Sequence, residues 1–171
     1  MIKTRVILGI SVVLLVALDQ WVKQWARVYL QPVGRLPIID GFIGFRYMEN
    51  AGAAFGILQG ARWFFVVLTV IVLGMMIWYE RSLPTSKLYM AVRIPMTLIA
   101  AGAIGNFIDR LLFGYVVDMF EFLFINFPIF NVADILLVVG VSIYVIVALF
   151  IIKDEVVPTS DSTKESSDEH A

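Results

Sequence analysis

Residues 135–152 read ILLVVGVSIYVIVALFII, a run of eighteen residues without a charge. Three further stretches are almost as apolar, namely Val6–Val22, Trp63–Tyr79 and Ile94–Ile108. A helix needs about 20 mostly apolar residues to cross a bilayer. Because the bilayer core holds no water, a spanning backbone must satisfy its own hydrogen bonds, which favours helices. We therefore predict an all-α membrane protein with four transmembrane helices, at about residues 6–27, 61–80, 90–110 and 132–152.

The composition of the whole chain excludes several other classes of protein. Of the 171 residues, 60% are hydrophobic and 16% are charged, whereas soluble domains have about 45–50% and about 25%. This excludes a soluble globular domain, a disordered chain and a nucleic-acid-binding protein. The chain has no cysteine, and its one histidine, His170, is the penultimate residue. We therefore expect no metal site, no cofactor, no cysteine nucleophile and no Ser–His pair.

The connections between the spans suggest an orientation. Four spans place both termini on one side, and the short middle connection and the two ends suit the cytoplasm. Residues 28–62 contain Pro32, Pro37 and several glycines, and we expect them to form a small extracytoplasmic β-rich lobe between the first two helices. Residues 111–133 are apolar but interrupted by Gly114 and Pro128. We interpret them as a segment that lies in the interface or dips into it.

The two ends of the chain receive separate interpretations. The first apolar run follows MIKTR and lacks a small-residue cleavage site, so we interpret it as a span that is not removed. Residues 154–171 are polar, acidic and low in complexity. We predict that they form a disordered cytoplasmic tail, outside a membrane domain that covers residues 1–153.

The polar residues of the predicted spans gather at one end of the bundle. An ionisable group at membrane depth costs about 2.5–3.5 kcal/mol on insertion scales, so each one requires a reason. These residues lie at the expected outer ends of the helices or in the connection between the last two: Asp19, Lys23, Asn106, Asp109, Arg110, Asp118, Asn131 and Asp134.

Each of these groups also permits a purely structural interpretation. Asp19 and Lys23 have the i,i+4 spacing of an intrahelical ion pair. Asn131 and Asp134 have the spacing of a helix N-cap and an acid at N3, a variant of the capping box. The remaining structural interpretations are a turn at Asp118, an interfacial pair of Asp109 with Arg110, and close helix packing at Gly102 and Gly105.

Elimination leaves carboxylates as the available catalytic groups. Ser11 and Ser142 are the serines within the spans, and neither has a lysine within helical reach. Two aspartates that share one proton can activate a water molecule, one acting as base and the other as acid. Asp118 and Asp134 lie on either side of one short connection, and we predict that they form such a pair and titrate as a unit.

Two functions of other classes are also consistent with this composition. In a small ion- or proton-coupled transporter, Asp19, Asp118 and Asp134 would be relay groups. Against this, no polar line reaches the inner side, and the apolar run Trp63–Tyr79 of the second span has no charged residue. In a non-catalytic membrane scaffold, the carboxylates would be helix caps and ion pairs. Neutral substitution of Asp118 separates these hypotheses, because only a protease would lose a peptide product.

Five short blocks resemble the bacterial lipoprotein signal peptidases (signal peptidase II), which are membrane-embedded aspartyl proteases. The blocks occur in the expected order: DQ at 19–20 followed by Lys23, NAGAAFG at 50–56, GAIGNFIDR at 102–110, VVD at 116–118 and FNVAD at 130–134. Ala101 and Met119 depart mildly from the family pattern, and Glu49 has no role that we can assign.

The resemblance implies a specific activity and a specific set of residues. It implies four helices with both ends in the cytoplasm, an outer β-rich lobe, and cleavage of prolipoproteins just before a diacylglyceryl-modified cysteine. The expected partners are such signal peptides and membrane lipids, and we expect a monomer. The resemblance assigns catalysis to Asp118 and Asp134. It assigns substrate binding or support of the site to Asn50, Gly52, Asn106, Arg110, Asn131, Asp19 and Lys23.

Overall fold

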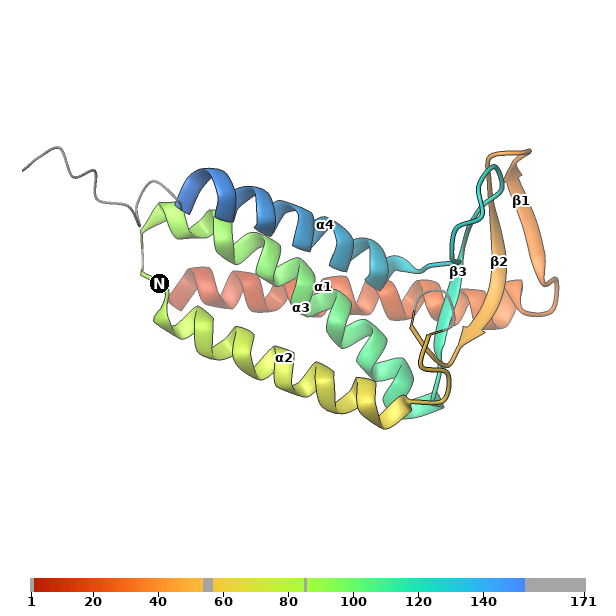
Figure 1. The fold of residues 1–171 in the computed structure, drawn as a ribbon, viewed down its shortest axis with the longest axis horizontal. Coiled ribbons are helices and arrows are strands. Elements are labelled where there is room, and N and C mark those ends of the chain that lie inside the picture. The colour runs from red at the N-terminus through yellow and green to blue at the C-terminus, as the bar shows by residue number, and fades with distance from the viewer. Residues whose placement is uncertain (1, 54–56, 85, 153–171) are drawn as a thin grey trace, which may run out of the picture.

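The computed structural model describes residues 2–53, 57–84 and 86–152. Within them, four long helices form a bundle: α1 (Ile2–Trp25), α2 (Arg62–Ser82), α3 (Met90–Phe113) and α4 (Val132–Val147) (Figure 1). A π-helical turn continues α1 over Ala26–Leu30, another continues α4 over Ala148–Ile152, and a 3-10 turn (Lys87–Tyr89) precedes α3. The four helices are long and apolar enough to cross a membrane, as predicted. The predicted tail, 154–171, lies outside the described residues.

The helices expose apolar side chains and bury polar ones. Ile10, Val13 and Leu14 of α1 are more than half exposed, whereas the residues that this helix buries are Asp19 and Lys23. A lipid environment accounts for this pattern, because exposed apolar surface is then favourable and polar groups must be enclosed by protein.

Glycines allow α3 to pack closely against its neighbours. A Cβ atom at Gly102 would collide with the carbonyl oxygen of Ala133 and the side chain of Leu137, and one at Gly105 would collide with the carboxylate of Asp19. The prediction of close packing at Gly102 and Gly105 is therefore confirmed. As a result, α3 is in contact with both the α1 segment that carries Asp19 and the start of α4.

A small antiparallel sheet stands at the end of the bundle opposite the N-terminus (Figure 1). Its strands are β1 (Arg35–Ile39), β2 (Ile43–Asn50) and β3 (Val116–Phe122), in the order β1-β2-β3. The first two come from the connection after α1, where a β-rich lobe was expected. The third comes from the connection between α3 and α4, where residues 116–122 of the expected interfacial segment form a strand of this sheet. The term all-α is inaccurate, because the fold is mostly helical with one sheet.

Burial on both faces explains why β3 resembles a membrane segment in the sequence. Val117 and Met119 pack into a core with Ala26 and Leu30 at the end of α1. Asp118, which points the other way along the strand, is also buried. Gly114 ends α3 with a positive φ of 86°, a conformation that glycine adopts readily. The chain turns there into β3, which carries Asp118 to the start of α4.

Candidate active site

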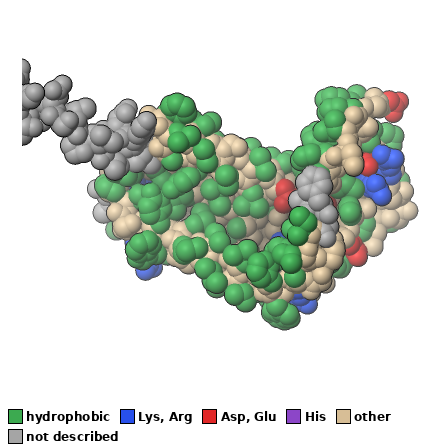
Figure 2. Space-filling view, viewed as in Figure 1, with side chains coloured by type: hydrophobic (Ala, Val, Ile, Leu, Met, Phe, Trp, Pro, Cys, Tyr) green, Lys and Arg blue, Asp and Glu red, His purple; other side chains and the backbone are tan. Residues whose placement is uncertain are grey.

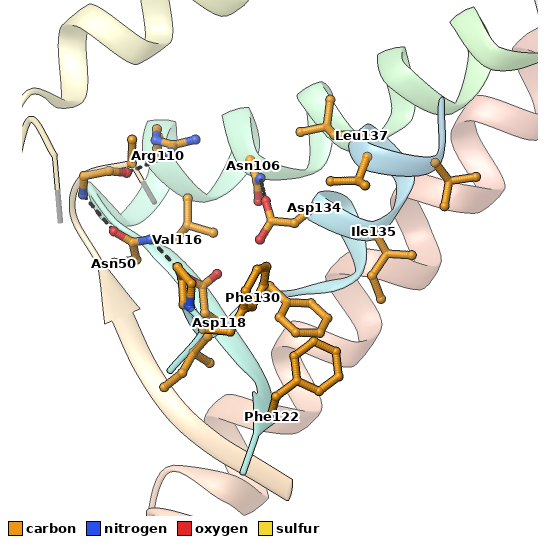
Figure 3. A pocket seen from close by; sticks show the side chains of 17 residues that line it. Asn50, Asn106, Arg110, Val116, Asp118, Phe122, Phe130, Asp134, Ile135 and Leu137 are labelled. Atoms are coloured by element: carbon orange, nitrogen blue, oxygen red, sulfur yellow. Dashed lines mark hydrogen bonds between the residues drawn. The ribbon is translucent and has the colours of Figure 1, made fainter. Parts of the chain in front are cut away.

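Asp118 and Asp134 line the same cavity, which has a volume of about 470 Å³. Figure 3 shows the two side chains directed toward the same space, one from β3 and the other from the first turn of α4. Of the other predicted site residues, the wall includes Asn50, Gly52, Asn106 and Arg110. The remaining wall is mostly apolar. Ala53, Val116 and Phe122 contribute to it, and the rest comes from α4 and the segment before it: Phe127, Pro128, Ile129, Phe130, Ile135, Leu137, Val138 and Val139.

Two asparagines hold the carboxylate of Asp118, which is 2% exposed. Asn131 Nδ2 donates to its Oδ1 at 2.6 Å, and Asn50 Nδ2 donates to its Oδ2 at 3.0 Å. Burial, and then the negative charge of Asp134, raise the pKa of Asp118 to about 7. These two effects exceed the opposing hydrogen bonds, so this carboxyl group can hold a proton near neutral pH.

Asp134 is the third residue of α4 and forms the predicted capping box. Asn131 Oδ1 accepts from the backbone N–H of Asp134 at 3.0 Å, and Asp134 Oδ2 accepts from the backbone N–H of Asn131 at 3.1 Å. The other carboxylate oxygen, Oδ1, accepts from Asn106 Nδ2 at 2.8 Å and lies toward the cavity. The structural interpretation is therefore correct, and it leaves one face of the carboxylate directed at the site.

Asn106 and Asn131 connect the two aspartates to each other. Asn131 Nδ2 donates both to Asp118 and, at 3.2 Å, to Asn106 Oδ1. Asn106 in turn donates to Asp134. A continuous chain of hydrogen bonds thus runs from one carboxylate to the other through two buried amides.

Arg110 contacts the loop that follows β2. Its Nη2 donates to the carbonyl oxygen of Gly52 at 3.0 Å, and the N–H of Gly52 donates to Asn50 Oδ1 at 3.0 Å. The guanidinium also lies 4.6 Å from the ring centroid of Phe65 in α2. Residues 54–56, which belong to the NAGAAFG block at 50–56, lie outside the described part of the chain.

The predicted pair of Asp109 with Arg110 is wrong. Neighbouring residues on a helix point about 100° apart, so the Arg110 side chain reaches the Gly52 loop while Asp109 faces α1. There Asp109 contacts Lys23 at 3.4 Å and Arg27 at 3.1 Å. The predicted ion pair of Lys23 with Asp19 is confirmed at 2.9 Å.

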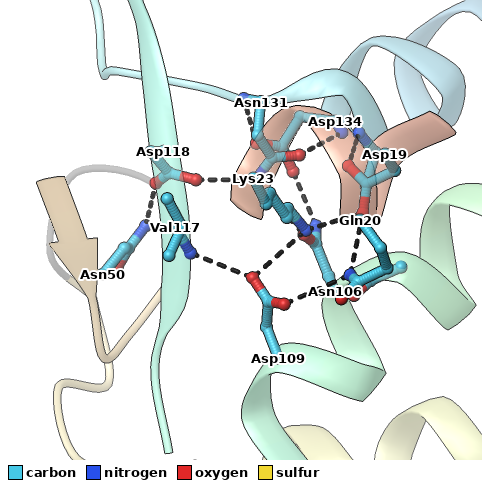
Figure 4. Close-up of polar contacts among 12 residues, drawn as sticks. Asp19, Gln20, Lys23, Asn50, Asn106, Asp109, Val117, Asp118, Asn131 and Asp134 are labelled. Atoms are coloured by element: carbon cyan, nitrogen blue, oxygen red, sulfur yellow. Dashed lines mark hydrogen bonds and ion pairs between the residues drawn. The ribbon is translucent and has the colours of Figure 1, made fainter. Parts of the chain in front are cut away.

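Arg27, Asp109 and Gln20 belong to a largely buried polar network that the sequence patterns did not assign to the site. Figure 4 shows Asp109 and Gln20 within it. Gln20 Nε2 donates to the carboxylates of both Asp19 and Asp109, at 3.2 Å each. The signal for Arg27 was available in the sequence, because it follows Asp19 and Lys23 at successive i,i+4 positions. The choice of Asp109 as their common partner depends on how α1 and α3 pack.

Comparison with known proteins assigns the family. The family described as signal peptidase (SPase) II matches residues 11–150, most of the chain. The chain belongs to the signal peptidase II family. Its relatives include lipoprotein signal peptidases of Streptococcus pyogenes serotype M5 (strain Manfredo) and serotype M18 (strain MGAS8232). Each is 46% identical over 137 residues, which cover 80% of this chain and 89% of the relative.

Solved structures agree with this assignment. A bacterial membrane enzyme determined at 2.3 Å has a TM-score of 0.77 and 32% identity, covering 92% of each chain. A second bacterial membrane enzyme, determined at 1.9 Å, has a TM-score of 0.73 and 33% identity, covering 84% of this chain and 92% of the other. Membership of the signal peptidase II family makes the chain a membrane aspartyl peptidase. The transporter and scaffold hypotheses are therefore set aside.

Proposed function

We propose that this signal peptidase II removes signal peptides from prolipoproteins by cutting before a diacylglyceryl-modified cysteine, with Asp118 and Asp134 as its catalytic pair. The observation that carries this proposal is the shared cavity. Two carboxylates, joined by buried amides, line it together, and the charge of one raises the pKa of the other. Two carboxylates coupled in this way share one proton, because the state in which both are ionised is unfavourable.

The singly protonated pair supplies an acid and a base to a water molecule. The ionised carboxylate takes a proton from the water, and the water oxygen attacks the carbonyl carbon of the scissile bond. The protonated carboxyl group gives its proton to the carbonyl oxygen, which produces a tetrahedral diol. The first carboxyl group then protonates the leaving nitrogen while the second takes back a hydroxyl proton. The C–N bond breaks, and the pair returns to its singly protonated state.

The wall of the cavity suits a substrate that is itself held in lipid. The α4 side is formed by Ile135, Leu137 and Val138, and Phe127 and Phe130 come from the segment before it. Figure 2 shows a notch between the bundle and the sheet, bordered largely by hydrophobic side chains. We propose that the signal helix and the acyl chains of the modified cysteine enter from the bilayer along this notch, bringing the scissile bond to the aspartates.

The neighbouring polar groups position the substrate and the catalytic pair in this proposal. Asn50, Gly52 and Arg110 form one linked side of the cavity, where they can orient the peptide backbone or the ester region of the lipid. Asn106 and Asn131 orient the two carboxylates, and Asp19 and Lys23 support them from behind.

We further propose that the sheet lies at the outer face of the bacterial cell membrane and both termini lie in the cytoplasm. Residues 1–153 would form a monomeric peptidase domain in contact with membrane lipids, with 154–171 as a tail. The absence of cysteine allows a labelling test. Phe42→Cys, at a turn where the side chain is 51% exposed, should react with an impermeant thiol reagent from outside. Ser86→Cys should react from the cytoplasm, and the reverse pattern would contradict the orientation.

Cleavage of a lipidated precursor peptide by purified enzyme tests the catalytic assignment. Asp118→Asn and Asp134→Asn should each abolish product formation, because an amide keeps the shape of the carboxylate but cannot exchange the proton. Asp40→Asn, in the exposed turn between β1 and β2, is the matched control and should remain active. Near-normal cleavage by either catalytic variant would refute the assignment.

A further inference from the structure

Lys23 is enclosed by protein, and its ammonium group has three polar partners that lead toward the cavity. Its Nζ lies 2.9 Å from Asp19 Oδ2, 3.4 Å from Asp109 Oδ2 and 2.9 Å from Asn106 Oδ1. Lys23, Asp19 and Asp109 are each 0% exposed. Figure 4 shows this group between the helices, behind the two aspartates that line the cavity.

The two carboxylates bound to Lys23 each hold a backbone N–H next to one catalytic aspartate. Asp19 Oδ1 accepts from the N–H of Ala133 at 2.9 Å, and Ala133 directly precedes Asp134. Asp109 Oδ2 accepts from the N–H of Val117 at 3.1 Å, and Val117 directly precedes Asp118. One cation thus connects the start of α4 to β3 through two equivalent contacts.

The third partner fixes the orientation of an amide. Asn106 Oδ1 accepts from Lys23, and this places Asn106 Nδ2 against Asp134 Oδ1 at 2.8 Å. The opposite amide orientation would place an NH₂ group against the ammonium and an oxygen against the carboxylate, and both contacts would be repulsive. The charge of Lys23 therefore determines which end of Asn106 faces Asp134.

Simple helix packing does not require such a network. The charges of Asp19 and Asp109 are balanced by those of Lys23 and Arg27, but burying charged groups carries a desolvation cost that apolar residues of similar volume avoid. The contacts made by this network end on the segments that carry Asp118 and Asp134. The need to hold these two segments in place accounts for the arrangement of the network.

We propose that Lys23 is a positioning residue that sets the separation and relative orientation of the Asp118 and Asp134 carboxylates, acting through Asp19, Asp109 and Asn106. This inference rests on the proposed catalytic role of the two aspartates. Lys23 does not reach the cavity wall, so its effect falls on the reaction step and not on substrate binding. A displacement of about 1 Å at reacting groups reduces rate about 100-fold.

Removal of Lys23 alone would leave excess buried negative charge, so the decisive variant is charge-balanced. Lys23→Met combined with Asp19→Asn removes one cation and one anion, retains the Asp109–Arg27 ion pair and keeps an amide oxygen for the N–H of Ala133. This enzyme should accumulate in the membrane and keep KM within about 3-fold, while kcat falls about 100-fold. A kcat near the wild-type value in this charge-balanced variant would show that Lys23 merely balances charge, and would overturn the proposal.

The pH dependence of the reaction rate provides a second test, because it would not change if Lys23 had a purely structural role. The charged groups that act on Asp118 are Lys23 from α1, Arg110 from α3 and Asp134 from α4, while β2 contributes the neutral Asn50. The positive charge of Lys23 favours the ionised form of Asp118. The charge-balanced variant removes this cation together with the anion of Asp19, which is not among the main influences on the pKa of Asp118, so the alkaline limb of the rate profile should move to higher pH. An unchanged profile, or a variant that fails to fold, would assign Lys23 a structural role only.

A second buried cation provides the matched control. Arg93 contacts Glu80 at 3.1 Å at the other end of the bundle, so Arg93→Met with Glu80→Gln removes a comparable pair far from the cavity. This variant should lower thermal stability but leave kcat and the pH profile unchanged. The outcome is separable from that of the proposed function, because activity in Asp118→Asn would refute the catalytic pair, whereas activity in the Lys23 variant would refute only the positioning role.

Discussion

Two clusters of charged residues, each built around a buried cation, lie at opposite ends of this bundle and hold different groups in place. At the end near the N-terminus, Arg93 donates to Glu80 and to the carbonyl oxygens of Leu83 and Pro84, the residues that follow α2. At the other end, the Lys23 cluster holds backbone groups next to Asp118 and Asp134. The first cluster closes a helix end and a turn, and the second connects segments that meet at a cavity.

The comparison shows that burial of charge alone does not identify a functional site in a membrane protein. Arg93 is 6% exposed and Lys23 is 0% exposed, so the two are nearly equally enclosed. They differ in what their partners contact next. A series of contacts that leads from the cation to carboxylates lining a cavity indicates a functional role. A series that ends on the carbonyl groups of a helix terminus indicates a structural role.

The largest expected effect comes from combining the two catalytic substitutions. Asp118→Asn with Asp134→Asn should be no worse than either single variant, because groups that act as one unit are not additive. Initial rates with the lipidated precursor, measured at high enzyme concentration, provide the comparison. Independent, multiplicative losses would indicate that the aspartates act in separate steps.

A smaller effect is expected on stability. The pKa of Asp118 is raised to about 7 in the fold from a usual value near 3.8, so the folded protein holds this proton more tightly than the unfolded chain. The resulting stabilisation is complete below pH 3.8 and is lost as the pH rises through 7. Thermal unfolding in detergent should therefore show Asp118→Asn gaining stability relative to wild type between pH 5 and pH 8. A constant difference between the two over this range would contradict the raised pKa.

The smallest effect is expected from the C-terminal residues, which belong to neither cluster in our interpretation. A stop codon after Pro158 removes polar residues that have no role in the proposed chemistry. Cleavage should stay within about 3-fold of the full chain, since changes away from packed or catalytic groups are usually small. Loss of cleavage by a truncated enzyme that still inserts normally into membranes would show that this segment takes part in function.

Much of this architecture was predictable from local sequence patterns. Uncharged runs such as residues 135–152 predicted the helices, and the spacing of Asn131 with Asp134 predicted the capping box. Both signals lie within a few helical turns, where the periodicity of the backbone determines which side chains meet. For the same reason the ion pair of Asp19 with Lys23 was predictable.

Features that depend on tertiary packing were not predictable in this way. The β3 sequence VVDMFEF is buried on both faces, so it lacks the polar and apolar alternation of a half-exposed strand and resembles a membrane segment. The partners of Asp109 and Arg110 depend on the rotation of α3 relative to α1 and to the Gly52 loop. The sequence contains both residues side by side, but only the packed helices separate their roles.

The pH dependence of kcat/KM for a lipidated precursor tests the central claim most directly, because it reports the protonation of the free enzyme. A pair that shares one proton predicts a bell-shaped profile. The rate should fall on the alkaline side through a pKa of about 7, where Asp118 loses its proton, and on the acid side, where the pair no longer shares a single proton. A rate that stays constant from about pH 6 to about pH 9 would contradict a proton shared between Asp118 and Asp134.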